Sequence, residues 1–216
     1  MGIRQKNVRI LGEKPLYQWV LDTAIKSNLF SRIIVSTDIN SILTDESYPS
    51  ELVEVQERPR SLAKDIPMKW VIGYVLDQYI DKPDYFALMQ PTSPFLRVED
   101  IERCVTALTV LKGDDSCQTV RRVKHHDHAF NQRVVKDWDV VFAFPKQRDD
   151  VRKQVQPEHY AFGNLVVTKT SYFLETGDFF GNSTGIEIPW KYGIDIDYEE
   201  DLELAEVLLE SSRIVL

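Results

Sequence analysis

Apolar residues recur along the chain in two alternating patterns. A spacing of three and four residues predicts amphipathic helices over residues 15–28, 69–79, 98–111 and 198–209. Short apolar runs at 32–38 and 84–89 predict buried strands, and each run ends in polar residues. Strand, polar turn and helix in this order are typical of an α/β fold with a mostly parallel sheet. In such folds ligands bind beyond the carboxyl ends of the strands, so functional side chains are expected after Val35 and Met89.

Residues 113–168 follow a different pattern. Strand-like pieces at 116–123, 140–144 and 162–168 are joined by polar loops. This pattern predicts a small antiparallel excursion from the sheet, of the kind that serves as a dimerisation arm. Elsewhere no stretch reads as a linker between domains, so we expect residues 1–216 to form a single domain.

Composition and charge narrow the class of protein. Lys and Arg number 26 against 34 Asp and Glu, which gives a net charge of −8 over 216 residues. This balance argues against sequence-independent nucleic-acid binding, which requires Lys and Arg to neutralise phosphates. No apolar run approaches the roughly 20 residues that span a bilayer, and the first residues lack the apolar stretch of a signal peptide. With only two cysteines, we expect a cytoplasmic protein that binds neither nucleic acid nor membrane.

The strongest candidate for chemistry is Asp195-Ile196-Asp197. In an extended segment the two carboxylates point the same way, roughly 6.6 Å apart. Mg²⁺ takes one or two carboxylates and completes its shell with water and phosphate oxygens, so a metal site is one interpretation. The alternative is helix capping, because Glu200 follows Asp197 by three residues and an apolar helical stripe comes next. Both interpretations hold together if Asp197 caps the helix and Asp195 carries the metal.

Other polar groups give weaker signals. The turn Gln90-Pro91-Thr92-Ser93-Pro94 offers an amide and two hydroxyls that suit a sugar or ribose, although Ser and Thr are also ordinary cap residues. The basic residues Arg4, Lys6, Arg9, Arg58 and Arg60 either hold phosphates or form solvated surface. His125, His126 and His128 fit an exposed loop better than a metal site, since no further ligand pattern surrounds them.

Five stretches taken together resemble the CMP-sialic acid synthetase family of cytidylyltransferases. They occur in the family's order and cover nearly the whole chain. They are Gly2-Ile3-Arg4-Gln5-Lys6-Asn7 with Gly12-Glu13-Lys14-Pro15-Leu16; Val35-Ser36-Thr37-Asp38; Arg58-Pro59 with Leu62-Ala63 and Asp65; Gln90-Pro91-Thr92-Ser93-Pro94; and Ile194-Asp195-Ile196-Asp197 with Glu200-Asp201-Leu202.

The resemblance implies a three-layer, Rossmann-like α/β fold of the nucleotide-diphospho-sugar transferase type. It also implies a Mg²⁺-dependent reaction in a homodimer. In that reaction the anomeric hydroxyl of an acidic keto-sugar attacks the α-phosphate of CTP, which gives the CMP-sugar and pyrophosphate. The related 3-deoxy-manno-octulosonate cytidylyltransferases are the alternative within the enzymes.

The resemblance also implies residue roles. On the nucleotide side, Arg4, Lys6 and Asn7 would meet CTP, and Arg58 would contact its cytidine end. Asp195 and Asp197 would hold Mg²⁺, with Asp195 and Lys6 as the catalytic pair. On the sugar side, the implied residues are Gln90, Thr92, Ser93, the pair Phe179-Phe180, and Arg152 or Lys153 reaching from the partner subunit.

Two departures from the family pattern bear on function. The family begins with a buried strand and a Gly-rich phosphate loop, and this chain begins at the tail of that loop. We expect the true start to lie upstream; the alternative is a chain that binds nucleotide or assembles without catalysing. The second departure is Tyr160-Ala161-Phe162-Gly163-Asn164, where the family has an Asn-Gly pair. The swapped order predicts an unusual nonulosonate as substrate.

Overall fold

The computed structural model describes residue 3 and residues 5–63, 65–110, 114–145 and 157–216. Its α-helices are α1 (Leu16–Ser27), α2 (Asn40–Leu43), α3 (Met68–Asp77), α4 (Val98–Val110), α5 (Thr170–Thr176) and α6 (Glu199–Glu210). Its strands are β1 (Ile10–Leu11), β2 (Lys14–Pro15), β3 (Ile33–Thr37), β4 (Val53–Glu57), β5 (Tyr85–Met89), β6 (Ser116–Arg122), β7 (Arg133–Lys136), β8 (Asp139–Phe142), β9 (Tyr160–Lys169) and β10 (Ser183–Glu187). Short 3₁₀ turns include η1 (Lys6–Val8), η2 (His125–Asp127), η3 (Ala129–Asn131) and η5 (Trp190–Gly193).

The central sheet has the strand order β10-β6-β9-β5. Strand β10 runs parallel to β6, and β9 runs antiparallel to both β6 and β5. Three of these four strands therefore point the same way, and only β9 is reversed. A separate parallel pair joins β3 to β4. The mostly parallel α/β sheet expected from the strand–turn–helix order is confirmed.

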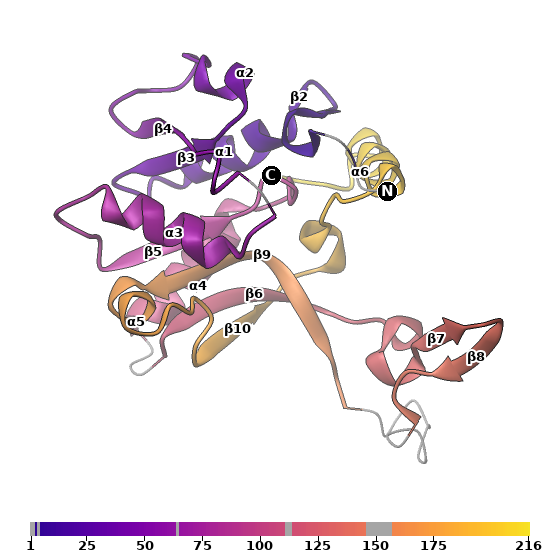
Figure 1. Ribbon diagram of the computed structural model, residues 1–216. Coiled ribbons are helices and arrows are strands. Elements are labelled where there is room, and N and C mark those ends of the chain that lie inside the picture. The colour runs from indigo at the N-terminus through magenta and orange to yellow at the C-terminus, as the bar shows by residue number, and fades with distance from the viewer. Residues whose placement is uncertain (1–2, 4, 64, 111–113, 146–156) are drawn as a thin grey trace.

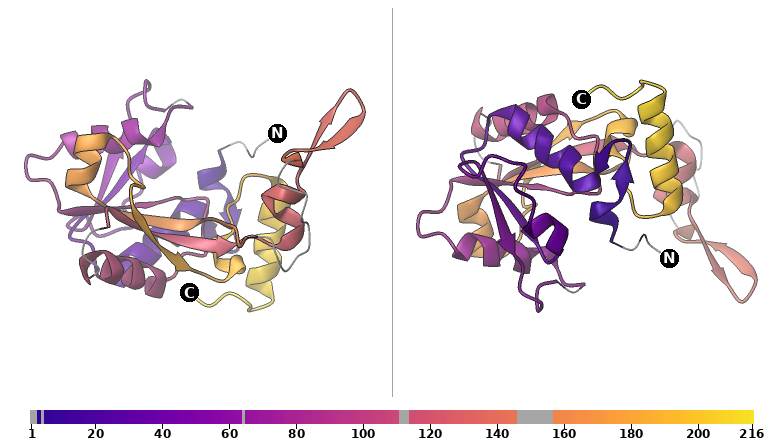
Figure 2. Two further views of the ribbon diagram at one scale, coloured as in Figure 1. Left: turned by 90° about the horizontal axis from the view of Figure 1, so that it is seen from below. Right: turned by 90° about the horizontal axis from the view of Figure 1, so that it is seen from above.

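Helices cover both faces of this sheet (Figures 1 and 2). On one face, Ile101, Cys104 and Leu108 of α4 pack with Leu165 and Val167 of β9. On the other face, side chains of α3 and α5 pack against Phe86 and Leu88 of β5. Helix, sheet and helix form the three layers, because each amphipathic helix buries its apolar stripe against the sheet.

The predicted helices are all present, and their ends differ by at most two residues from the expected ones. Helix α1 buries Leu16, Val20 and Ala24 along one stripe and ends where Asn28 adopts a left-handed conformation, with φ of 53°. The sequence pattern missed the short helices α2 and α5 and the strands β1, β2, β4, β7 and β10. In β4, for example, the run Val53-Glu54-Val55-Gln56-Glu57 is half polar, because this strand buries only part of its surface.

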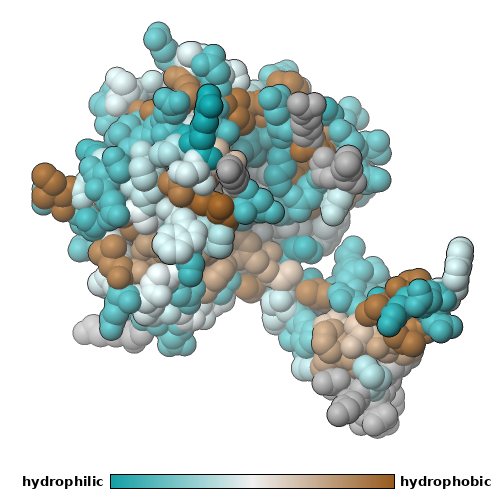
Figure 3. Space-filling model, in the orientation of Figure 1, coloured by the Kyte–Doolittle hydropathy of each residue, from teal (hydrophilic) through white to brown (hydrophobic). Residues whose placement is uncertain are grey.

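The antiparallel excursion is shorter than the predicted 113–168. Strands β6 and β9 pair antiparallel, as expected, but both belong to the central sheet. The part that projects from the body comprises η2, η3 and the hairpin β7–β8 (Figure 1). Apolar residues lie among hydrophilic ones on the surface of this hairpin (Figure 3), and Trp138 is 97% and Val135 70% exposed. The sequence pattern does not distinguish the strands of the hairpin from β6 and β9 of the central sheet, because both sets show similar short apolar runs.

The contact between α1 and the chain after α2 gives a pH-dependent stability. The hydroxyl and backbone N–H of Ser47 and the hydroxyl of Tyr17 donate to the Asp45 carboxylate. These hydrogen bonds lower the pKa of Asp45 to about 2.

Because the folded state holds the pKa of Asp45 below its unfolded value, its stabilisation is full above pH 4 and is lost as the pH falls toward 2. We expect Asp45→Asn to lower the unfolding free energy by about 1 kcal/mol at pH 7, since solvent screens this partly exposed group. Thermal melts between pH 2 and pH 7 should show a shallower slope below pH 4 for the variant. Glu46→Gln, at an exposed neighbour, is the control; an equal change there would contradict the assignment.

Candidate active site

Three segments that are far apart in sequence meet at the two aspartates. The backbone N–H of Ile3 donates to the Asp197 carbonyl at 3.0 Å, and the N–H of Ile196 donates to the Thr92 carbonyl at 2.8 Å. The Lys6 ammonium lies 2.5 Å from Oδ1 of Asp197. The structure therefore brings together the N-terminal segment, the Gln90–Pro94 turn and the Asp195–Asp197 segment, which were separate candidates in the sequence analysis.

The alternation expected for Asp195-Ile196-Asp197 is present. Ile196 is fully buried in a cluster with Leu11 and Phe95, and both aspartates are exposed. Asp197 is paired with Lys6, whereas the Asp195 carboxylate makes no hydrogen bond or ion pair with any described residue. Asp195 thus presents free acceptor oxygens at the surface, beside Asp197, whose carboxylate is paired with the Lys6 ammonium.

Helix capping, the alternative interpretation of this segment, falls on a different residue. Helix α6 begins at Glu199, with Tyr198 at its N-cap. The Asp201 carboxylate accepts hydrogen bonds from the N–H groups of Asp197 and Tyr198, at 3.0 and 2.8 Å. The expected capping by the Asp197 side chain is wrong, because the helix starts two residues after it. Asp201 satisfies the free backbone donors, and Asp197 is left to pair with Lys6.

The donor set fits a hard divalent cation that is shared with a phosphate ligand. Within residues 3, 5–63, 65–110, 114–145 and 157–216, no group of three or more His, Cys, Asp and Glu side chains could hold a metal ion by itself. Mg²⁺ does not need such a group, because one or two carboxylates with water and phosphate oxygens complete its shell. Asp195, with unengaged oxygens, and Asp197 could supply these two carboxylates.

The Gln90–Pro94 turn presents its amide and buries its hydroxyls. Thr92 and Ser93 are 5% and 1% exposed, and the Ser93 hydroxyl has no partner among the described residues. Gln90 is half-buried, at the carboxyl end of β5. Gln90 is therefore the side chain of this turn that a ligand can reach most readily. The sugar-binding roles expected for these three residues stay predictions.

Arg58 is held at the carboxyl end of the β3–β4 pair. Its guanidinium donates to the carbonyl and the hydroxyl of Ser36, and its backbone N–H donates to the Thr37 carbonyl at 2.7 Å. Burial lowers the pKa of Arg58, and the nearby charge of Asp38 opposes this shift. The side chain is thus a preorganised, half-buried cation, as a nucleotide-binding role requires.

The backbone of Phe179-Phe180 is fixed against the sheet. The Thr168 hydroxyl donates to the Phe179 carbonyl at 2.6 Å, and the Ser116 hydroxyl donates to the Phe180 carbonyl. The Phe180 ring packs edge-on against Phe162 of β9, with ring centroids 5.9 Å apart. Phe162 was not among the expected site residues. Its position directly before the swapped Gly163-Asn164 pair is the sequence feature that could have indicated it.

Some expected site residues lie elsewhere or are not described. Arg4, Arg152 and Lys153 lie outside the described residues, so their implied roles stay predictions. Asn7 is half-buried in η1 next to Lys6. His128 was expected in an exposed loop, but it is 4% exposed and stacks on His159 with centroids 3.8 Å apart. Residues 157–159 fold back over the loop, which the sequence could not indicate.

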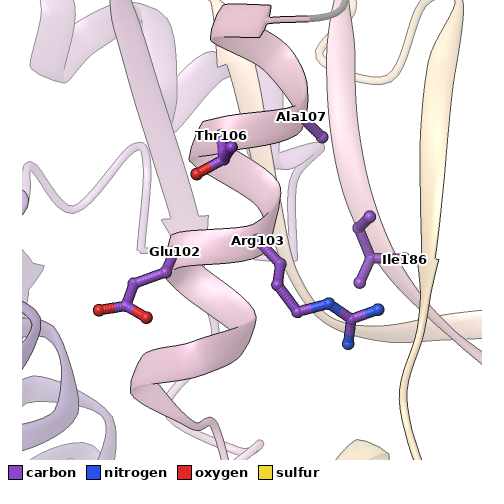
Figure 4. A pocket seen from close by; sticks show the side chains of 5 residues that line it. All are labelled: Glu102, Arg103, Thr106, Ala107 and Ile186. Carbon is purple, nitrogen blue, oxygen red and sulfur yellow. The ribbon is translucent and has the colours of Figure 1, made fainter.

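Two pockets of the described surface lie away from the aspartates. A shallow pocket of about 460 Å³ lies between α4 and β10, where Arg103 reaches toward Ile186 and Glu102 points away from it (Figure 4). A second, of about 340 Å³, lies where β3 and β5 begin, between Phe30, Tyr85 and Leu108. Neither pocket is lined by Lys6, Gln90, Asp195 or Asp197. No helix among the described residues is long and apolar enough to cross a membrane.

Comparison with known proteins gives a consistent result. The cytidylyltransferase family profile matches residues 1–214. An N-acylneuraminate cytidylyltransferase from Escherichia coli is 28% identical over 94% of this chain and 48% of its own length. The chain thus spans about half the length of the curated relatives that it matches first. The post-translational flagellin modification protein B of Campylobacter coli is 23% identical over 99% of this chain and 92% of its own length.

Solved structures give the same fold. A CMP:2-keto-3-deoxy-manno-octonic acid synthetase complexed with CTP superposes with a TM-score of 0.70, at 13% identity over 97% of this chain and 93% of that one. A 4-diphosphocytidyl-2C-methyl-D-erythritol synthase from Anaerococcus prevotii gives a TM-score of 0.60, at 17% identity over 94% and 93%. The nucleotidyltransferase fold and the resemblance to CMP-sialic acid synthetases are confirmed.

Proposed function

Because the chain belongs to the cytidylyltransferase family, we propose that it activates an acidic nonulosonate-type sugar with CTP, which yields the CMP-sugar and pyrophosphate. The observation that carries this proposal is the juxtaposition of Lys6, Asp195 and Asp197 beside the turn that bears Gln90. The family match accounts for the nucleotide, and the relatives named N-acylneuraminate cytidylyltransferase favour a nonulosonate as acceptor.

The reaction is an in-line substitution at phosphorus. The anomeric oxygen forms a bond to the α-phosphorus as the bond to the pyrophosphate oxygen breaks. For such a reaction the protein positions two substrates and stabilises negative charge. A divalent cation, Mg²⁺ in our proposal, supplies part of that charge when bound. Asp195 and Asp197 would hold it, and Lys6 and Arg58 would direct their positive charge toward the nucleotide.

The sugar side of the site is assigned from position. Gln90 lies at the carboxyl end of β5, and Phe179 and Phe180 are fixed over the sheet by the hydroxyls of Thr168 and Ser116. We assign Gln90 to the polar side of the acidic sugar and the aromatic pair to its acyl substituent. The remaining residues keep the roles that the resemblance implies. Thr92, Ser93 and Arg152 or Lys153 belong to the sugar side, and Arg4 and Asn7 belong to the nucleotide side.

A second copy of the chain completes the proposed protein. The projecting β7–β8 hairpin exposes Val134, Val135, Trp138 and Val140, which makes it a surface that a partner subunit would cover. We propose a homodimer through this arm, with residues 1–216 acting as one domain in the cytoplasm. Analytical ultracentrifugation tests the assembly: a dimer is expected, and a monomer at micromolar concentration would remove the partner's contribution to the site.

Pyrophosphate release from CTP tests the activity directly. The chain is incubated with CTP, Mg²⁺ and a panel of nonulosonates and 3-deoxy-manno-octulosonate, and the products are identified by mass spectrometry. Release with a nonulosonate supports the proposal, and release only with the octulosonate moves the chain to the alternative. CTP binding by calorimetry without release from any sugar would identify a chain that binds nucleotide and does not catalyse.

A substitution in the Phe179-Phe180 pair should weaken binding of the sugar and leave binding of CTP unchanged. We expect Phe180→Leu to raise the KM for the sugar by roughly fivefold, because an aromatic contact contributes about 1 kcal/mol beyond area burial. The KM for CTP should stay the same. Leu174→Ser, on the exposed side of α5, is the control. A rise in the KM for CTP in Phe180→Leu would place the aromatic pair on the nucleotide instead.

A further inference from the structure

A buried ion pair lies behind the candidate active site. Asp100, in the first turn of α4, is fully buried. Arg97 donates to both of its carboxylate oxygens, with Nε and Nη2 at 2.8 and 2.7 Å. Burial by itself lowers the pKa of Arg97, but the hydrogen bonds and charge of Asp100 outweigh it and raise that pKa. The two hydrogen bonds fix the orientation of each side chain relative to the other.

The guanidinium of this pair also holds the turn that leads to the aspartates. It lies 4.1 Å from the centre of the Tyr192 ring, and Tyr192 is 6% exposed within η5. A planar guanidinium stacks on an aromatic ring in a way that an ammonium cannot reproduce. Since η5 ends at Gly193, the pair acts on the backbone two residues before Asp195.

The sheet holds the same turn from its other side. The Asn164 amide donates to the Tyr192 carbonyl at 2.9 Å, and its oxygen accepts from the Thr119 hydroxyl at 2.8 Å. The backbone N–H groups of Asn164 and Leu165 donate to that hydroxyl, at an irregularity in the β6–β9 register. Asn164 is 1% exposed, so this residue of the swapped Gly-Asn pair serves the turn rather than a ligand.

We propose that Arg97, with Asp100 and Asn164, is a positioning residue that orients Asp195 and Asp197 through Tyr192. Beyond Asp195, the N–H of Ile196 is bonded to the Thr92 carbonyl, so the backbone is fixed on both sides of the exposed carboxylate. The ion pair touches neither aspartate, and its effect passes through η5. This inference rests on the proposed metal-binding role of the two aspartates.

Mn²⁺ binding in the presence of CTP tests the inference without relying on turnover. We expect Arg97→Lys, which keeps the charge and loses the planar stack, to raise the Mn²⁺ concentration for half-occupancy roughly tenfold, measured by electron paramagnetic resonance. Tyr192→Leu, which keeps the burial and removes the ring, should have a similar effect. Arg103→Lys is the matched control, because Arg103 is the other arginine near Asp100, at 3.9 Å, and its side chain on α4 is exposed.

A variant that only destabilises the fold must be distinguished from one that changes the orientation of Asp195 and Asp197. Leu76→Ala destabilises the core on the opposite face of the sheet, and we expect it to lower the melting temperature with no change in Mn²⁺ binding. Unchanged Mn²⁺ binding in both Arg97→Lys and Tyr192→Leu would overturn the inference, as would equal weakening in Leu76→Ala. A third outcome separates the two proposals: the wild-type chain binds Mn²⁺, the variants bind it more weakly, and no sugar is activated. In that case the proposed function fails and this inference stands. A wild-type chain that binds no Mn²⁺ overturns both.

Discussion

Replacement of Asp195 by Asn should abolish most of the turnover and leave the fold intact. We expect kcat to fall roughly 100-fold or more, because Asn keeps the shape and removes the negative charge that a divalent cation needs. Asp195 is exposed and makes no hydrogen bond or ion pair with a described side chain, so its replacement removes little packing. The melting temperature should therefore change by no more than a surface substitution does, equivalent to about 0.5 kcal/mol.

The measurement is pyrophosphate release at increasing Mg²⁺, together with a thermal melt. Glu200→Gln, another acidic residue close to Asp195 and at the exposed start of α6, is the matched control and should keep its turnover. Near-normal turnover of Asp195→Asn at saturating Mg²⁺ would show that the metal is held elsewhere. A large fall in the melting temperature would show instead that Asp195 has a structural partner.

Replacement of Lys6 by Gln should also reduce turnover, with the opposite effect on metal binding. We expect kcat to fall about 100-fold, because Lys6 is a cation placed where phosphate charge develops. Its removal also releases Asp197, whose Oδ1 lies 2.5 Å from the ammonium. An unpaired carboxylate attracts a divalent cation more strongly, so Mn²⁺ binding should be unchanged or tighter.

Turnover and Mn²⁺ binding, measured on the same preparation of each variant, distinguish the role of Asp195 from that of Lys6. Asp195→Asn weakens both, whereas Lys6→Gln weakens only turnover. Arg9→Gln is the control, since Arg9 forms a neighbouring surface ion pair with Glu199 at 2.9 Å and such pairs contribute little. Weaker Mn²⁺ binding in Lys6→Gln would mean that Lys6 orients Asp197 for the metal rather than facing the nucleotide.

Local pattern accounts for what could be predicted. The spacing of apolar residues placed the helices α1, α3, α4 and α6, since each buries a stripe set by its own sequence. The outward direction of Asp195 and Asp197 followed from alternation about buried Ile196. The family motifs pointed to CTP chemistry. All of these depend on residues that are close together in the chain.

Contacts between distant segments depended on the tertiary structure. Lys6 and Asp197 are 191 residues apart, and nothing near either one indicates the other. The same holds for Arg97 stacked on Tyr192, and for His128 covered by His159. Helix α6 begins later than its pattern suggested, so Tyr198 rather than Asp197 is its N-cap residue and the Asp201 carboxylate accepts from the Tyr198 N–H.

Local sequence patterns are enough to predict the α/β fold class, the main helices and the exposed pair of aspartates. The packed fold is needed to show which cation pairs with Asp197, which strands belong to the central sheet and what holds the turn before Asp195. The difference lies in the range of the interactions. Periodicity and turn chemistry act over a few residues, whereas ion pairs, stacking and strand order are set when the helices and strands pack together.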